Sequence, residues 1–367
     1  MSEPTKPPGK RGLTRRKLLA GGVVAAPTLA LLHETVPHRG LHEALGGNQA
    51  QAATGAEVGH DAHAGHSAST AHAGFSGGTV VDHAANGFDP TEILRDFDYG
   101  QTRRLASGRV LREWELYAVD KEIEVAPGVK YPAWTYNGRV PGPTLRCHEG
   151  EALRIRFVNG SAHPHTIHFH GIHPAFMDGM PGIGEQRDGG SIAPGASFTY
   201  EFDAEPFGLH LYHCHISPLA SHIARGLYGA FIVDPRQGRP EADEMVMVMN
   251  GFDTNFDGAN EVYAVNTVGF HHVADPVRVK RDELVRIYLV NILEFDFVNS
   301  FHVHANFFHY FPTGTSLQPI EFTDTIIQGQ GQRGILELRF PHPGKYMFHA
   351  HVSEFAELGW TGFFEVS

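Results

Sequence analysis

The sequence has few cysteines, no long apolar run and a deficit of positive charge. Cys147 and Cys214 are its only cysteines, which excludes a disulfide framework and a four-cysteine zinc ribbon. Its N-terminal apolar run, residues 18–32, has about 15 residues, and a multi-pass membrane protein is excluded. The formal net charge is −12, and residues 53–367 alone hold 22 Lys/Arg against 38 Asp/Glu. Such an acidic chain repels nucleic acid and anionic membranes, so we expect neither as a partner.

Histidine, in contrast, is abundant. The chain has 26 His among its 367 residues, together with 42 Gly, 23 Pro and 25 Phe. The glycine, proline and aromatic content is typical of a turn-rich globular protein that buries a sizeable core. So many imidazoles point first to metal binding.

The first 52 residues have the features of an export signal. Arg15 and Arg16 form a twin-arginine start, an interrupted apolar run covers residues 18–32, and Ala50-Gln51-Ala52 offers a cleavage site. We therefore predict that residues 1–52 are a twin-arginine export signal. The mature protein would be extracellular, periplasmic or at the cell surface, without membrane contact after cleavage. An uncleaved anchor, or a basic segment before a core helix, is the alternative.

Residues 53–88 form a stretch rich in Ala, Gly, Ser and His with few large apolar side chains. It contains His60, His63, His66 and His72. We predict a disordered, His-rich linker, because such a segment buries too little apolar surface to offset the entropy lost on ordering. A weak copper-collecting arm is the alternative, since unprotonated imidazoles bind transition metals.

An internal repeat organises the rest of the chain. Short runs of Val, Ile, Phe and Tyr alternate with Pro-Gly, Asn-Gly and Gly-Gly turns, which predicts an all-β sandwich or barrel. The segments that repeat are residues 145–159 with 277–291 and residues 208–215 with 344–351. We therefore expect two homologous β domains, residues 89–240 and residues 241–367.

Four His-x-His pairs occur at equivalent places in the two repeats. The pairs are His168/His170, His213/His215, His302/His304 and His349/His351. Residues i and i+2 of a strand point to the same face, so each pair delivers two imidazoles to one site. Eight imidazoles exceed what one mononuclear metal can use, and the pattern therefore predicts a multinuclear cluster.

A second metal site is expected on the other face of the strand that holds Cys214. A blue-copper site requires two His, one Cys and a weak or absent axial group. His165, Cys214 and His222 supply this trigonal set, with Leu227 in the axial position. Leu has no donor atom, which disfavours the cupric state and raises the potential. The second repeat has Asn299, Ala350, Leu358 and Phe363 at these places, so only the first domain is expected to hold this copper.

These motifs resemble those of multicopper oxidases, and in particular of two-domain, laccase-like oxidases. The resemblance rests on His165 to Gly171, on Tyr212 to Leu227, and on the pairs beginning at His302 and His349. It implies two cupredoxin-like, Greek-key β-sandwich domains and four coppers per functional unit: one type 1, one type 2 and two type 3. By motif position, His168 and His302 would bind type 2 copper. The type 3 pair would be bound by His170, His213, His215, His304, His349 and His351.

The resemblance further implies oxidation of a small-molecule reductant, with phenols and aromatic amines as the default, and reduction of dioxygen to water. Cys214, His213 and His215 would be the catalytic core. Asp178, Glu185 and Glu354 lie near the motifs as candidate proton donors, and we favour Asp178. Cys147 is expected to be a small core residue.

Two other functions were weighed against the oxidase. Copper nitrite reductases also consist of two cupredoxin domains, but that family has an Asp at the position matching His168 and a small residue at that matching His215. A non-enzymatic copper-storage or electron-transfer protein would not need eight further imidazoles. The resemblance also predicts a homotrimer, in which the first domain of one subunit meets the second domain of the next and the trinuclear centres lie at the interfaces.

Overall fold

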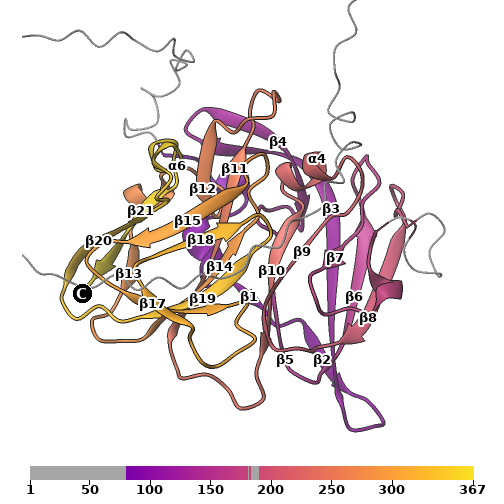
Figure 1. The fold of residues 1–367 in the computed structure, drawn as a ribbon. Helices are drawn as coiled ribbons and strands as arrows, with labels where there is room; N and C mark the ends of the chain where they lie inside the picture. Colours follow the sequence, from indigo (N-terminus) through magenta and orange to yellow (C-terminus); the bar gives the residue numbers. More distant parts are fainter. Residues whose placement is uncertain (1–79, 181, 183–189) are drawn as a thin grey trace, which may run out of the picture. The chain divides into compact units, whose positions relative to one another are not determined.

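The computed structural model describes residues 80–180, 182 and 190–367. The predicted export signal and most of the predicted linker lie outside the described residues. The expectation of an all-β fold with two cupredoxin-like domains is confirmed, because the described chain folds into four sheets with only short helices (Figure 1). Within the described residues, no helix is long and apolar enough to cross a membrane.

The first domain consists of two sheets, here named sheets I and II. Sheet I contains β2 (Gln101–Arg104), β3 (Val110–Ala126), β6 (Ala152–Asn159) and β8 (Ser197–Asp203), with β4 (Val129–Tyr136) paired to β3. Sheet II contains β1 (Phe97–Asp98), β5 (Thr144–His148), β10 (Tyr228–Asp234), β9 (Gly208–His213) and β7 (His168–Phe169). The short helices here are α2 (His83–Asn86), α3 (Pro90–Ile93), η2 (Ala175–Met177) and α4 (Leu219–Ala224).

The second domain repeats this plan in sheets III and IV. Sheet III contains β12 (Val262–Val265), β11 (Asp243–Phe252), β14 (Val285–Asn291), β19 (Arg333–Leu338), β16 (Phe308–Pro312) and β17 (Glu321–Thr323). Sheet IV contains β13 (Val277–Val279), β21 (Thr361–Val366), β20 (Gly344–His349), β15 (Val298–Val303) and β18 (Thr325–Gly329). Its helices are α5 (His271–Ala274) and α6 (Ser353–Glu357). Strands β1 to β10 form sheets I and II, and strands β11 to β21 form sheets III and IV, so the boundary between the domains lies between β10 and β11.

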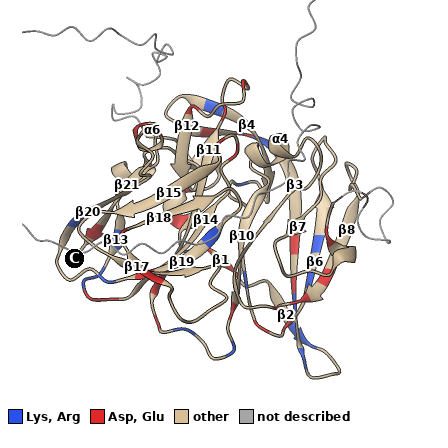
Figure 2. Ribbon diagram, viewed as in Figure 1, with Lys and Arg blue, Asp and Glu red and all other residues tan. Residues whose placement is uncertain are grey.

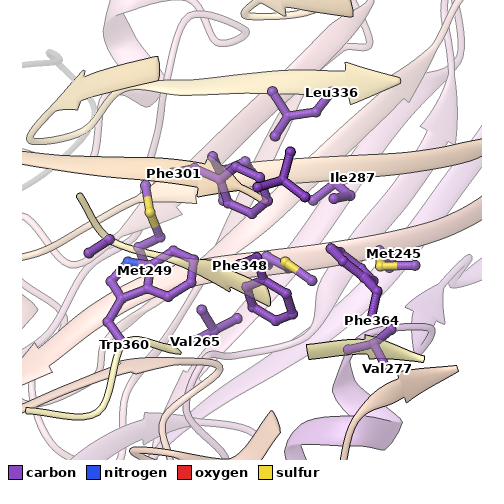
Figure 3. Packing of buried hydrophobic residues seen from close by; sticks show 14 of the residues in the cluster. Met245, Met249, Val265, Val277, Ile287, Phe301, Leu336, Phe348, Trp360 and Phe364 are labelled. Carbon is purple, nitrogen blue, oxygen red and sulfur yellow. The ribbon is translucent and has the colours of Figure 1, made fainter. Parts of the chain in front are cut away.

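The four sheets stack as layers in the order I, II, III and IV, with a hydrophobic core between each neighbouring pair. One core fills the space between sheets I and II and includes Cys147, which is fully buried as expected. A second core joins the domains, with Leu211 and Ala230 of sheet II packed with Val248 and Val290 of sheet III. The third core lies between sheets III and IV (Figure 3). Sheets II and IV are therefore separated by sheet III.

The core between sheets III and IV is rich in aromatic and methionine side chains (Figure 3). The rings of Phe301 and Phe348 stack with centroids 6.0 Å apart, and Trp360 meets Phe301 at 5.9 Å. Met245 and Met249 of β11 face these rings from the other sheet. Trp360 is fully buried, and this packing fixes β15 and β20 side by side.

The exposed face of sheet I carries interleaved charges (Figure 2). Arg154 of β6 pairs with Glu113 of β3 at 2.9 Å and with Glu201 of β8 at 2.6 Å. Such cross-strand pairs between exposed side chains each contribute a few tenths of a kcal/mol at most. This face therefore supports solubility and strand register.

The prediction that residues 53–88 form a disordered linker is wrong for the last nine of these residues. Residues 80–88 include helix α2, whose N-terminus is capped where Asp82 Oδ1 accepts the Ala85 N–H at 3.0 Å. The side chain of Asn86 bonds both the carbonyl and the N–H of Glu124, at 2.9 and 2.8 Å. Phe88 is buried in the core between the domains. These contacts order a stretch whose composition alone favours disorder.

Candidate metal centres

His165, Cys214 and His222 form the candidate mononuclear site. His165 follows β6 and exchanges two backbone hydrogen bonds with Ile192, Cys214 directly follows β9, and His222 lies on α4. The two Nδ1 atoms are 3.2 Å apart, and Cys214 Sγ lies 3.8 Å from His165 Nδ1 and 3.3 Å from His222 Nδ1. A point equidistant from three atoms so spaced is about 2.0 Å from each, close to metal–nitrogen bond lengths.

The electrostatics of this site also suit a metal ion. Burial lowers the pKa of His165 to about 3 and that of His222 to about 4, so both rings are neutral at pH 7 and offer lone pairs. Burial raises the pKa of the Cys214 thiol to about 11. The backbone N–H of Thr166 donates to the sulfur at 3.5 Å, which supports the thiolate that forms when a metal displaces the proton. The residues therefore fit a copper of the blue type.

Leu227 lies in the same buried cluster as Cys214, and its carbonyl accepts the Cys214 N–H at 3.0 Å. Its axial role stays a prediction. In the second domain, the places of the mononuclear ligands are taken by Asn299, Ala350, Leu358 and Phe363. Ala350 and Leu358 are buried in the core between sheets III and IV, so apolar packing fills the space that a metal would occupy.

Four histidines of the first domain form a cluster, here named the first quartet. Its members are His168, His170, His213 and His215. Antiparallel pairing of β7 with β9 places His168 opposite His213, and the second member of each pair follows the strand end. The rings of His168 and its three partners lie 5.0 to 5.4 Å apart, and the Nε2 atoms of His170 and His213 are 2.8 Å apart. Imidazole nitrogens thus converge as a shared metal requires.

Four histidines of the second domain form the equivalent second quartet. Its members are His302, His304, His349 and His351. Pairing of β15 with β20 places His302 opposite His349, and the Nε2 atoms of His304 and His349 are 3.0 Å apart. The second quartet is more open than the first, because His304 and His351 are exposed.

Backbone carbonyls fix the ring tautomers in both quartets in the same way. The Nδ1–H of His168 donates to the Asp178 carbonyl at 2.9 Å, and that of His302 donates to the Asp324 carbonyl at 3.0 Å. The Nδ1–H groups of His213 and His349 donate to the carbonyl of the next residue, at 2.9 and 2.6 Å. These bonds leave Nε2 unprotonated and free to bind metal, which is the usual outer arrangement of a metal-binding histidine.

Burial favours the neutral form of four of these rings. It lowers the pKa of His170 to about 2 and that of His213 to about 4, with neighbouring histidines adding to the effect at His170. The pKa of His168 and that of His349 are lowered for the same reason. Neutral imidazoles with convergent lone pairs fit copper, which they bind well.

Comparison with known proteins agrees with this geometry. Two multicopper oxidase family models match the chain, one over residues 118–238 and the other over residues 239–367. A crystal structure described as a multicopper oxidase is 67% identical, with a TM-score of 0.76 over 78% of this chain and 100% of that one. The chain belongs to the multicopper oxidase family.

Other relatives of this multicopper oxidase carry different names. The copper-containing nitrite reductase of Neisseria gonorrhoeae is 30% identical over 258 residues, which are 65% of this chain and 63% of that protein. The chain thus covers less than two thirds of that relative. The structure of a blue copper oxidase from Nitrosomonas europaea is 28% identical, with a TM-score of 0.62 over 70% of this chain and 86% of that one.

The two quartets of the oxidase lie in different layers. The first is at the end of β7 and β9 in sheet II, and the second is at the end of β15 and β20 in sheet IV. All eight histidines lie among the described residues. Every ring contact between two of them joins members of the same quartet. Stacked sheets lie about 10 Å apart, so sheets II and IV are separated by about 20 Å.

The candidate proton donors have different surroundings. Asp178 Oδ2 lies 3.6 Å from His168 Nδ1 and 3.8 Å from His173 Nε2, beside the first quartet. Glu354 is exposed on α6, three residues past His351. Glu185 lies outside the described residues. The preference for Asp178 therefore stays a prediction with a favourable location.

Several neighbours of the metal ligands lie outside the sequence motifs. The ring of His173 meets that of His168 at 5.1 Å, beside the first quartet. Trp134 is partly buried, and its ring packs 5.4 Å from that of His165 and 4.9 Å from that of His222. The hydroxyl of Ser161 bonds the Nε2 of His165 at 2.9 Å. In the sequence, the only indication of these contacts was that His173 and Ser161 lie a few residues from a predicted ligand.

Proposed function

We propose that this multicopper oxidase is of the laccase type, taking single electrons from a phenolic or similar donor and reducing dioxygen to water. The observation that supports it is the complete set of convergent donors, with two imidazole quartets and one buried His₂Cys set. We further propose four coppers per functional unit: one type 1, one type 2 and two type 3. His165, Cys214 and His222 would hold the first of these.

When bound, the coppers would supply one-electron redox chemistry and the reduction of dioxygen. The chain's own contribution is position and proton supply. His213 and His215 flank Cys214 in sequence, so the two kinds of site are joined by the backbone of three consecutive residues. The carboxylate of Asp178, half-enclosed beside His168, would hold and deliver a proton through Oδ2. Carbonyl bonds to Nδ1 hold the quartet rings in their orientation.

We propose a homotrimer in which each trinuclear centre forms from the first quartet of one subunit and the second quartet of the next. Sheet III lies between the two quartets of a single chain, so the halves are too far apart to share one cluster. The exposure of His304 and His351 suits a surface that a neighbouring subunit covers. Head-to-tail contacts of this kind close into a ring. Light scattering of the copper-loaded protein should then give about three times the subunit mass.

Oxygen uptake with a methoxyphenol tests the proposed reaction. We expect one dioxygen consumed for every four phenols oxidised. His302→Ala should abolish this uptake, whereas His309→Ala should retain it, because the ring of His309 packs on Phe322 within sheet III, which holds neither quartet. Uptake that is absent from a fully copper-loaded protein would contradict the proposal.

Nitrite reduction is the second candidate function, because curated relatives at 30% identity are copper-containing nitrite reductases. The same preparation is therefore assayed anaerobically with nitrite and a reduced donor. Nitric oxide formation without aerobic oxygen uptake would favour this alternative over the oxidase.

We also propose export through the twin-arginine route. Replacing Arg15 and Arg16 together by Lys should retain the protein in the cytoplasm, while the wild type is recovered outside it. Unchanged export of the double variant would contradict the proposal.

A further inference from the structure

A third cluster of metal-binding side chains lies where the N-terminal segment meets the second domain. His83 of α2, Asp89 before α3 and His271 of α5 each offer one ligand atom, and these atoms all lie within 4.8 Å of one another. The rings of His83 and His271 have centroids 4.9 Å apart in an edge-to-face arrangement. None of the three residues belongs to the mononuclear site or to a quartet.

His83 and Asp89 keep donor capacity for an ion. The Nδ1 of His83 is buried and makes no hydrogen bond. Asp89 Oδ1 accepts the Thr91 N–H at 2.8 Å and lies 3.5 Å from His271 Nε2. Among the described residues, no Lys or Arg forms an ion pair with Asp89, so its negative charge faces histidines alone.

A second layer of contacts holds the cluster in position. The Thr91 hydroxyl donates to Asp275 Oδ2 at 2.7 Å and therefore accepts from His271 Nε2 at 2.8 Å, so an ion that binds this nitrogen displaces its proton. The ring of His272 packs against that of His271 at 4.9 Å. Hydrogen-bonded partners of this kind orient the ligands of metal sites and strengthen metal binding.

The cluster also has a route of entry. A cavity of about 590 Å³ is lined by His83 and His271 together with apolar side chains that include Val81, Phe270 and Phe363. An ion can therefore reach the imidazoles without opening the core. The apolar surroundings reduce competition from water for the ligands.

We propose that His83, Asp89 and His271 bind a divalent first-row transition-metal ion of the Zn²⁺ or Cu²⁺ type. Two imidazoles and one carboxylate are a donor set that these ions accept, with water completing the coordination. The bound ion fastens α2 to α5 of the second domain. An ion that binds only this folded arrangement stabilises it.

Zinc titration of the copper-loaded protein tests the site, with zinc as the probe because it is redox-inert. We expect the wild type to bind one more zinc than His83→Ala and to show a higher Tm with zinc, a rise that the variant lacks. Asp89→Asn keeps an N-cap residue and should fold, but it should bind this zinc at least tenfold more weakly. The control His342→Ala removes an exposed imidazole elsewhere and should behave as wild type.

Equal zinc stoichiometry in the wild type, His83→Ala and Asp89→Asn would overturn the proposal. Copper content is measured in the same samples, because zinc that merely replaces copper leaves the total metal unchanged and would also count against the site. The readout does not depend on the oxidase reaction, so failure of the proposed function would not affect it.

Discussion

The hydroxyl of Thr166 supports the first quartet, and Thr166→Val removes that support with little change in volume. In the wild type, Thr166 Oγ1 accepts the backbone N–H of His215 at 3.1 Å. Thr166 is fully buried, so no water can replace the lost acceptor. An unsatisfied buried N–H costs about 1–3 kcal/mol, and we expect the copper-free variant to lose that much free energy of unfolding.

The variant should also bind copper more weakly. The His215 backbone loses its anchor. The Thr166 N–H bond to Cys214 is retained, but the hydrogen bond of the Thr166 hydroxyl to the Cys214 sulfur is lost, so the effect falls on the quartet and on the mononuclear site. Loss of such outer partners lowers metal affinity by about 10–100-fold. Ser300→Ala is the matched change in the second domain, because Ser300 Oγ accepts the His351 N–H at 2.7 Å.

Denaturant unfolding of the copper-free protein and copper titration together measure both effects. The control is Thr135→Val, which removes a buried hydroxyl that donates to the Val119 carbonyl at 2.9 Å and not to the backbone of a metal ligand. It should lose about 1 kcal/mol of stability and retain copper affinity. Wild-type copper affinity in both Thr166→Val and Ser300→Ala would refute the reasoning.

Three further predictions concern single side chains. Cys214→Ser should abolish the intense blue absorption of a His₂Cys copper site, whereas Cys147→Ser should retain it; a blue Cys214 variant would reject the assignment. Leu227→Met should lower the type 1 potential by adding a weak axial thioether, and a redox titration that shows no fall would place the axial residue elsewhere. Burial raises the pKa of Glu294 to about 7 from its ordinary 4.5, so its protonated form stabilises the fold at low pH and that contribution is lost as pH rises through 7. Glu294→Gln should therefore be about 1–2 kcal/mol more stable than wild type at pH 8 and equal to it near pH 4.5, as measured by denaturant unfolding; equal stability at both would contradict this.

The period-two pattern of the histidines carried much of the sequence analysis. Because side chains alternate along a strand, His213 and His215 could be assigned to one site and Cys214 to another. The internal repeat extended the same reasoning to His349 and His351. The structure brings the members of each quartet together, and it places His213 and His349 at the last residue of their strands, which spacing alone did not reveal.

Contacts between distant segments were beyond the sequence. Trp134 packs on two candidate copper ligands because its backbone N–H donates to the carbonyl of Arg225, at the end of α4, at 2.9 Å, and no local pattern indicates this. The order at residues 80–88 depends on Asn86 reaching Glu124, a partner 38 residues away. Sheet III lies between the two quartets because of the way the two domains pack against each other. The internal repeat in the sequence does not specify this packing.

Mixing two inactive variants tests most directly whether neighbouring subunits share the trinuclear centre. One variant carries His168→Ala and His170→Ala, and the other carries His302→Ala and His304→Ala. In trimers assembled at random from equal amounts, three quarters contain both variants, and each of these has one intact interface in three. Co-expression should therefore restore about a quarter of wild-type oxygen uptake. Oxygen uptake that stays absent in confirmed mixed trimers would show that each centre is closed within one chain, and would contradict the account.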